Sequence, residues 1–111
     1  MLLNMRVYHL IWRKDMYFVV DKDTVGRIHG VLEKQPDKPK QIRVYIAGMG
    51  WGGPSFGLGL DQVKEDDIVE NIDGIDFVME KYLEETFGQI EVRWNGYSYA
   101  VGPVRGGKSS C

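Results

Sequence analysis

Residues that could carry out chemistry are few in this chain, and their spacing limits what that chemistry can be. The 111 residues contain one cysteine, Cys111 at the last position, and two histidines, His9 and His29. A single cysteine excludes an internal disulfide and a multi-cysteine metal site within one chain. Neither histidine has a cysteine or carboxylate at a recognisable ligand spacing. We therefore expect both histidines at the surface or at the edge of the core.

Acidic side chains are dense between positions 61 and 76. Such a run suggests calcium binding, but its spacing does not match the ligand positions of an EF-hand loop. We therefore expect a solvated acidic face. The acids of this run are Asp61, Glu65, Asp66, Asp67, Glu70, Asp73 and Asp76.

Glycine occupies six of the twelve positions in Gly48–Gly59. Such a density indicates positive φ angles or the close approach of another group. A dinucleotide-binding loop would be followed by a helix, and a P-loop by Lys-Ser or Lys-Thr, whereas Pro54 and a second β-type run follow here. Ser55 lacks the Gly-x-Ser-x-Gly context of a nucleophile turn. We predict neither a nucleotide site nor enzyme activity.

The composition is that of one soluble globular domain, with 43% apolar and 27% charged residues. A net charge of −2 and a pI near 5.6 give no electrostatic footprint for nucleic acid. No apolar run is long enough to cross a bilayer, and residues 1–14 lack the uninterrupted apolar stretch of a signal peptide. We expect a cytoplasmic protein with neither nucleic acid nor membrane as a partner.

Two predicted strands position the glycine-rich stretch. Gln41–Ala47 alternates in polarity, which predicts a half-buried strand with Arg43 and Tyr45 on the polar face. A second strand leaves the stretch, and Gly57 and Gly59 alternate along it. One face of this second strand is therefore either open or closely packed by another group.

The other elements follow from helix caps and turn signals. Asp21 or Asp23 is expected to cap a helix that runs to about Lys34. Asp73-Gly74 and Asn95-Gly96 each predict a type I′ hairpin turn. The remaining expected elements are strands at Tyr17–Val20, Asp66–Ile72, Ile75–Met79, Gln89–Trp94 and Tyr97–Val101, a less regular strand at Met5–Trp12, and a short helix at Glu80–Phe87.

The order of these elements resembles the A-type iron–sulfur carrier, or HesB-like, family over about Tyr17–Cys111. The most specific motifs are Ile42-Arg43-Val44-Tyr45-Ile46-Ala47-Gly48, Ser55-Phe56-Gly57-Leu58-Gly59-Leu60-Asp61 and Asp67-Ile68-Val69. The resemblance implies an α+β, mainly β fold: a compact HesB-like β-sandwich or partly open barrel with two short flanking helices. It divides the chain into an N-terminal appendage or extra strand (1–15), a HesB-like domain (16–104) and a flexible tail (105–111).

The resemblance also implies where a metal site would be. Such proteins bind iron or an iron–sulfur cluster through one cysteine in the glycine-rich loop and a Cys-Gly-Cys pair in the tail, because thiolates are the soft ligands that clusters require. By this resemblance Trp51, between Gly50 and Gly52, takes the position of the loop ligand, and Cys111 is the remaining metal ligand. Tryptophan cannot ligate iron. One thiol per chain, or two per dimer, falls short of the usual four.

Three explanations of this departure are open. The chain is a ligand-poor relative that keeps the scaffold to bind something else, or its tail is truncated after Cys111, or residue 51 is a selenocysteine whose UGA codon was read as tryptophan. Reading codon 51 and the sequence downstream of Cys111 in the native gene distinguishes them.

The expected function is that of an iron–sulfur cluster assembly or carrier-related protein, with binding of iron or cluster weak or lost in this form. The alternative is a non-enzymatic, metal-independent binding module on the same scaffold. The cofactor is accordingly iron or an iron–sulfur cluster, or none in this form. The partners implied are a second copy, as a homodimer or higher oligomer, and iron–sulfur assembly or recipient proteins.

Overall fold

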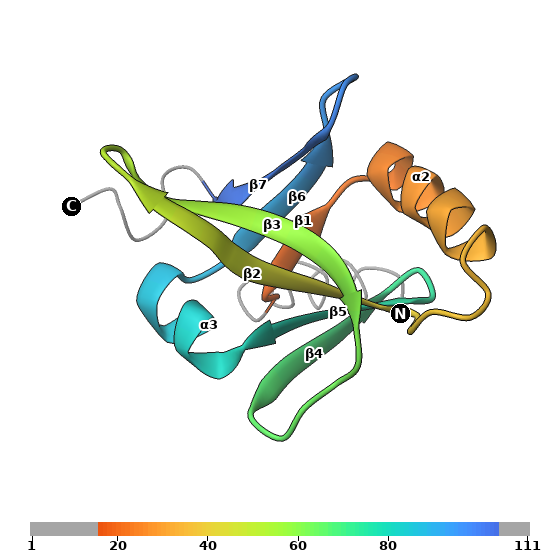
Figure 1. The fold of residues 1–111 in the computed structure, drawn as a ribbon, viewed down its shortest axis with the longest axis horizontal. Coiled ribbons are helices and arrows are strands. Elements are labelled where there is room, and N and C mark those ends of the chain that lie inside the picture. Colours follow the sequence, from red (N-terminus) through yellow and green to blue (C-terminus); the bar gives the residue numbers. More distant parts are fainter. Residues whose placement is uncertain (1–15, 105–111) are drawn as a thin grey trace, which may run out of the picture.

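The computed structural model describes residues 16–104, which form two mixed β-sheets with helices at their ends (Figure 1). The predicted strand at Met5–Trp12, the segment 1–15 and the tail 105–111 lie outside the described residues. The elements are β1 (Phe18–Val20), α2 (Lys22–Glu33), β2 (Gln41–Gly50), β3 (Gly53–Asp61), β4 (Asp67–Ile72), β5 (Ile75–Glu80), α3 (Lys81–Phe87), β6 (Ile90–Trp94) and β7 (Tyr99–Pro103).

Each sheet combines parallel and antiparallel pairs. The three-stranded sheet has the order β1-β6-β7, and the four-stranded sheet has the order β3-β2-β5-β4. β1 pairs with β6, and β2 with β5, in parallel; the other neighbours are antiparallel. The two sheets do not close into a barrel. This confirms the prediction of an α+β, mainly β fold with short helices.

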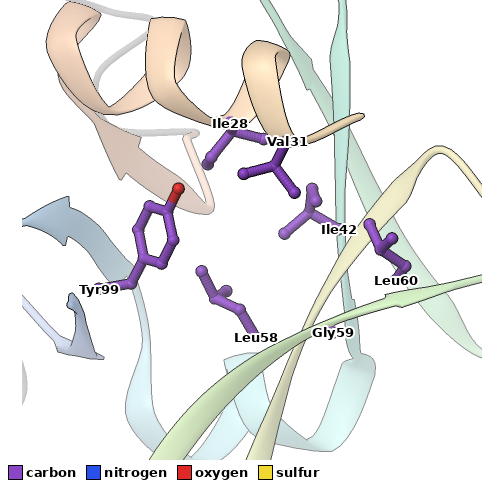
Figure 2. Close-up of a pocket in the computed structure, with 7 residues that line it drawn as sticks. All are labelled: Ile28, Val31, Ile42, Leu58, Gly59, Leu60 and Tyr99. Atoms are coloured by element: carbon purple, nitrogen blue, oxygen red, sulfur yellow. The ribbon is translucent and has the colours of Figure 1, made fainter. Parts of the chain in front are cut away.

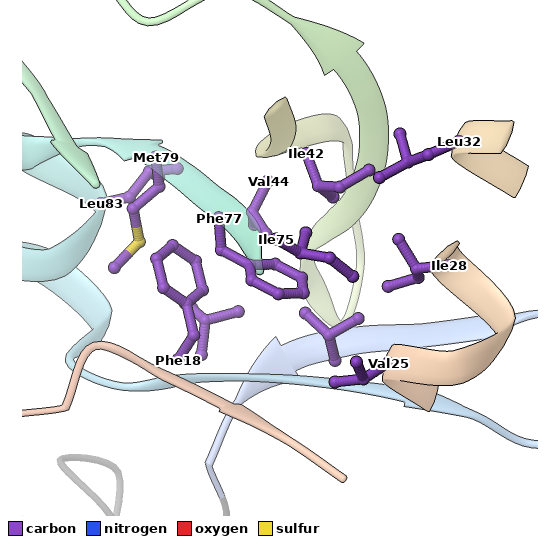
Figure 3. Packing of buried hydrophobic residues seen from close by; sticks show 12 residues of the cluster. Phe18, Val25, Ile28, Leu32, Ile42, Val44, Ile75, Phe77, Met79 and Leu83 are labelled. Carbon is purple, nitrogen blue, oxygen red and sulfur yellow. The ribbon is translucent and has the colours of Figure 1, made fainter. Parts of the chain in front are cut away.

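The core lies where the two sheets and the apolar face of α2 meet (Figure 3). Phe18 of β1 and Phe77 of β5 bring the sheets together, with ring centroids 5.7 Å apart. Val25 and Ile28 of α2 close one end of this core, and Leu83 of α3 is buried as well. The apolar alternation of the strands and the i, i+3, i+7 pattern of the helix therefore point into one shared core.

α2 begins where the sequence predicts. Asp21 is the N-cap, and its Oδ1 accepts a hydrogen bond of 2.8 Å from the backbone N–H of Thr24. This satisfies one of the free donors of the first turn and leaves the carboxylate at the positive end of the helix dipole. The hydrogen bonds from Thr24 also hold the pKa of Asp21 below its usual value.

The glycine-rich stretch is an extended hairpin instead of the loop that the sequence suggests. β2 continues to Gly50 and β3 begins at Gly53, so only Trp51 and Gly52 connect them. Of the six glycines, Gly53 alone has a positive φ, 106°. The prediction of a loop was wrong because glycine-rich sequence and β pairing are compatible when two long strands pair along their whole length.

The two residue pairs that predict hairpin turns, Asp73-Gly74 and Asn95-Gly96, form different turns. Asp73 and Gly74 both have positive φ, 52° and 90°, between Ile72 and Ile75, which confirms a two-residue turn of the I′ kind.

The second signal marks a hairpin, but its turn is four residues long, between Trp94 and Tyr99. Positive φ falls on Gly96 and not on Asn95. The Asn95 side chain instead accepts hydrogen bonds from the backbone N–H groups of Tyr97 and Ser98, an alternative that this residue type offers to a turn.

Candidate functional site at the β2–β3 hairpin

The tip of the β2–β3 hairpin carries the predicted site residues at the far end of a projecting arm (Figure 1). The Trp51 side chain is fully exposed, at 108% of its reference area, and Met49 is 77% exposed. Gly50 and Gly52 flank Trp51, and a Cβ added at either would meet nothing within 4 Å. Met49, Gly50 and Trp51 border only an open surface hollow. The tip therefore presents apolar side chains to solvent without enclosing a ligand.

A bulge sets the direction of this arm. Ile46 pairs with Phe56, but the next pair is Gly48 with Ser55, so Ala47 is an extra residue in β2. Such a bulge bends and twists the strand that contains it.

The bare face of β3 is covered by one aromatic ring. A Cβ on Gly57 would lie 3.0 Å from both Cζ and Oη of Tyr45, and a Cβ on Gly59 would lie 3.5 Å from its Cε1. Tyr45 is the cross-strand partner of Gly57. Of the two alternatives for this face, close packing is therefore the correct one. The tyrosine ring fills the space that glycine leaves and stiffens the arm.

Arg43 ties the base of the hairpin to the start of β4. Its Nε donates to Asp61 Oδ2 over 2.8 Å, its Nη1 donates to Asp67 Oδ1 over 3.0 Å, and its Nη2 donates to the Gln62 carbonyl over 3.0 Å and to Asp67 Oδ2. The backbone N–H of Lys64 also donates to Asp67. These bonds hold the connection between β3 and β4 against β2. We call Arg43, Asp61 and Asp67 the arginine clasp.

The groups of the arginine clasp favour one another's charged forms. Arg43 is only 8% exposed and the Asp67 side chain only 2%. Hydrogen bonds from Arg43 hold the pKa of the Asp67 carboxyl below its usual value, and those with Asp67 raise the pKa of Arg43 above its usual value. The pKa of Asp61 is also lowered, chiefly by the backbone N–H of Gln62. All three groups are therefore charged at neutral pH.

The expectation of a solvated acidic face was wrong for part of the run. Asp67 is buried against Arg43, and Glu70 Oε1 accepts hydrogen bonds from the backbone N–H groups of Tyr17 and Phe18, each 3.0 Å long. Alternation in β4 could have shown that Asp67 and Glu70 point to opposite faces. It could not have shown their partners, which are distant in the sequence.

An apolar hollow of about 150 Å³ lies between α2 and the far end of β3 (Figure 2). The phenol of Tyr99 stands at its wall and is the only polar side-chain group in the lining. Burial raises the pKa of this phenol above its usual value, so its hydroxyl stays protonated at neutral pH. No signal in the sequence predicted the hollow. It is lined by Ile28, Val31, Ile42, Leu58, Gly59, Leu60 and Tyr99.

The structure describes some of the residues considered for a metal site and not others. Trp51 lies at the hairpin tip, whereas Cys111 and His9 lie outside the described residues. His29 is at the core edge, as expected, with Nε2 2.9 Å from the carbonyl oxygen of Asp73. Among residues 16–104, no three histidine, cysteine or acidic side chains gather in a way that could hold a metal ion. Within the same range no helix is long and apolar enough to cross a membrane.

Comparison with known proteins identifies the fold. No known family profile and no curated protein sequence matches the chain. Among solved structures, it is similar to Escherichia coli SufA, a protein involved in the biosynthesis of iron–sulfur clusters. The two share 17% identity over 76% of this chain and 75% of SufA, with a TM-score of 0.63. The chain has the HesB/SufA-like fold.

A second neighbour agrees with this assignment. A protein from Aquifex aeolicus, determined in solution by NMR, shares 20% identity over 80% of this chain and 93% of its own, with a TM-score of 0.60. Residues 16–104 supply all of the sheets and helices described above. The glycine-rich hairpin, with Trp51 at its tip, is therefore part of a HesB/SufA-like fold.

Proposed function

We propose that this chain works in iron–sulfur cluster assembly or transfer, in a form whose own binding of iron or cluster is weak or lost. The fold supports the first part, because a structural neighbour with a TM-score of 0.63 is involved in cluster biosynthesis. The side chain at the hairpin tip supports the second part and is the observation that carries the proposal: position 51 holds an exposed indole.

The donor set does not fit a cluster. The indole of Trp51 has an N–H donor and no lone pair to offer a metal. The whole chain contains one thiol, Cys111, so even two chains supply two thiolates where an iron–sulfur cluster usually takes four. We derive no cluster chemistry from these residues.

A metal-independent binding module is the second candidate, and the exposure of the tip favours it. Tryptophan and methionine are enriched at protein contacts, and an isolated aromatic anchor can carry much of a binding energy. Trp51 and Met49 are both exposed at the end of an arm braced by Tyr45 and the arginine clasp. In this reading the tip contacts a partner where related scaffolds would hold metal. The tip offers no nucleophile with an adjacent base, and we propose that the protein is not an enzyme.

The cellular location, the partners and the oligomeric state are proposed on the same grounds. We propose cytoplasmic work with iron–sulfur assembly or recipient proteins, as a homodimer or higher oligomer. These features come from the likeness of the scaffold and from the acidic, largely polar composition.

Anaerobic reconstitution with iron and sulfide, followed by desalting, separates the two candidates. Weak visible absorbance and substoichiometric iron that disappear in Cys111→Ser support a ligand-poor carrier. A colourless, iron-free protein supports the metal-independent module. A stable, stoichiometric cluster that survives Cys111→Ser would contradict both.

A further inference from the structure

The hollow between α2 and β3 is about the size of a small aromatic group. Its volume is about 150 Å³ and its lining is apolar apart from Tyr99 (Figure 2). Pockets for drug-sized ligands usually exceed about 300 Å³, whereas an apolar cavity near 150 Å³ takes benzene. The hollow therefore suits a single inserted side chain better than a free metabolite.

The wall of the hollow is held in place by aromatic contacts. The Tyr99 ring packs edge-on against Trp94, with centroids 5.0 Å apart, and the guanidinium of Arg27 lies 4.1 Å from the centre of the Trp94 ring. Figure 2 shows the Tyr99 hydroxyl directed toward α2, across the hollow from Leu58. A phenol oxygen can accept a hydrogen bond, and an indole N–H can only donate one. The lining thus combines apolar contact with one acceptor, as an indole requires.

The same chain presents an indole with nothing packed around it. Trp51 is fully exposed at the hairpin tip between glycines. From Val44 to Leu60 the hairpin carries no acidic or basic side chain, so its approach to an apolar surface leaves no charge desolvated. Tyr97 is the other aromatic of the described residues that is exposed to a similar degree, at 92%. It provides a matched control.

Trp51 cannot reach the hollow of its own chain. The tip adjoins Gly53, at the start of β3, and the hollow lies at Leu58–Leu60 near its end. At about 3.3 Å per residue, five to seven residues of extended strand separate them by roughly 16 to 23 Å. Because β2 pairs along this length, the arm does not fold back. A Trp51 ring that enters such a hollow must therefore belong to another copy of the chain.

We propose that Trp51 of one copy inserts into the α2–β3 hollow of a second copy. The inserted side chain and the hollow are different surfaces. Insertion in one direction is therefore heterologous and leads to rings or open chains, whereas reciprocal insertion about a two-fold axis closes a dimer. The proposal concerns the partner of the same hairpin tip, and it requires no metal. It therefore stands whether or not the chain binds iron.

Complementation between two variants tests the contact. Trp51→Ala removes the inserted side chain but keeps the hollow. Val31→Arg, at a helix position that is 40% exposed, places a charge at the hollow but keeps Trp51. In sedimentation equilibrium, we expect wild type to associate with rising concentration and each variant to associate at least about thirty-fold more weakly, as for a hot-spot residue. An equimolar mixture of the two variants should form a 1:1 dimer and nothing larger.

Two controls make the result specific. Tyr97→Ala should associate as wild type does. Free indole, titrated into Trp51→Ala and followed by NMR, should shift the signals of Leu58, Leu60 and Tyr99 and should not do so in Val31→Arg. A wild type that stays monomeric at all concentrations would overturn the proposal, as would a mixture of the two folded variants that fails to pair. Association of wild type that persists in Trp51→Ala would also overturn it and would assign self-association to another surface.

Discussion

At the scale of single residues, Arg43 decides whether the base of the hairpin holds its shape. Its guanidinium satisfies Asp61, Asp67 and the Gln62 carbonyl at once. Both Arg43 and the Asp67 side chain are largely removed from water. Removing one member of such a pair leaves the other charge buried without a partner, which costs far more than the pair itself contributes.

Arg43→Leu should therefore lower the free energy of unfolding by about 3 to 5 kcal/mol. Equilibrium urea unfolding measures the change. The matched control is Lys64→Ala, since that ammonium group contacts Asp61 at 3.3 Å from a side chain that is 67% exposed. We expect the control to change stability by less than about 0.5 kcal/mol. Equal effects of the two substitutions would show that the clasp is not a buried pair.

The clasp should also make stability depend on pH in acid. Hydrogen bonds from Arg43 lower the pKa of Asp67 in the folded state, so the unfolded chain takes up its proton first as the pH falls. The stabilisation is present above the ordinary carboxyl pKa, near 3.9, and is lost as the pH drops through the folded value. We expect Asp67→Asn to be less stable at neutral pH and to lose less stability on acidification. Urea midpoints at several pH values between about 6 and 2.5 measure this; an unchanged acid slope in the variant would contradict it.

Sequence patterns could predict the face of Arg43 but not its burial. Strand alternation places Arg43 and Tyr45 on one side of β2. The structure confirms this, because Arg43 pairs with Gly59 and Tyr45 with Gly57 without a bulge between them. The partners of Arg43 are 18 and 24 residues away in sequence. A local pattern carries no information about such contacts, so the clasp appears only when β3 and β4 are in place.

At the scale of elements, the β2–β3 hairpin shows why a glycine-rich sequence does not by itself distinguish a loop from paired strands. Six glycines in Gly48–Gly59 are typical of a loop, yet only Gly53 needs a positive φ. Gly57 serves a different purpose, since it makes room for the Tyr45 ring. Composition alone does not distinguish a glycine needed for its positive φ, or a glycine needed for the space it leaves, from a glycine in a flexible loop. The distinction comes from the cross-strand register, which the sequence does not reveal.

Gly57→Ala and Gly59→Ala should change stability in opposite directions. Alanine is favoured over glycine inside a strand by about 0.5 to 1 kcal/mol, and a Cβ at Gly59 makes an ordinary 3.5 Å contact with Tyr45, so we expect this variant to gain stability. A Cβ at Gly57 lies 3.0 Å from the same ring and forces it aside, which should cost about 1 kcal/mol or more.

A double-mutant cycle with Tyr45→Ser attributes the cost to this contact. Without the ring, Gly57→Ala should become neutral or stabilising in thermal unfolding. A penalty that persists in the Tyr45→Ser background would show that Gly57 is needed for its backbone and not for the space it leaves.

At the scale of the whole molecule, the sequence predicts the fold better than it predicts the site. Caps, turns and alternation locate the helices and strands, because each depends on neighbours a few residues apart. Asp21 and Asp73-Gly74 are examples that the structure confirms as a cap and a turn. The hollow beside Tyr99 is different, since its lining comes from α2, β2, β3 and β7. Only the packed molecule brings these elements together.

At this scale the number of thiols that two chains supply together also matters. Trp51→Cys raises the count from one to two per chain, so that two chains offer the four thiolates that a cluster usually takes. β3 and β7 are in contact, and seven residues beyond Val104 can span at most about 25 Å. We expect Trp51→Cys, reconstituted anaerobically with iron and sulfide, to retain iron and visible absorbance through desalting. Trp51→Ser and the double variant Trp51→Cys/Cys111→Ser should lose both signals. If the double variant held as much iron as Trp51→Cys, the tail cysteine would not be a ligand and the pairing of positions 51 and 111 would be wrong.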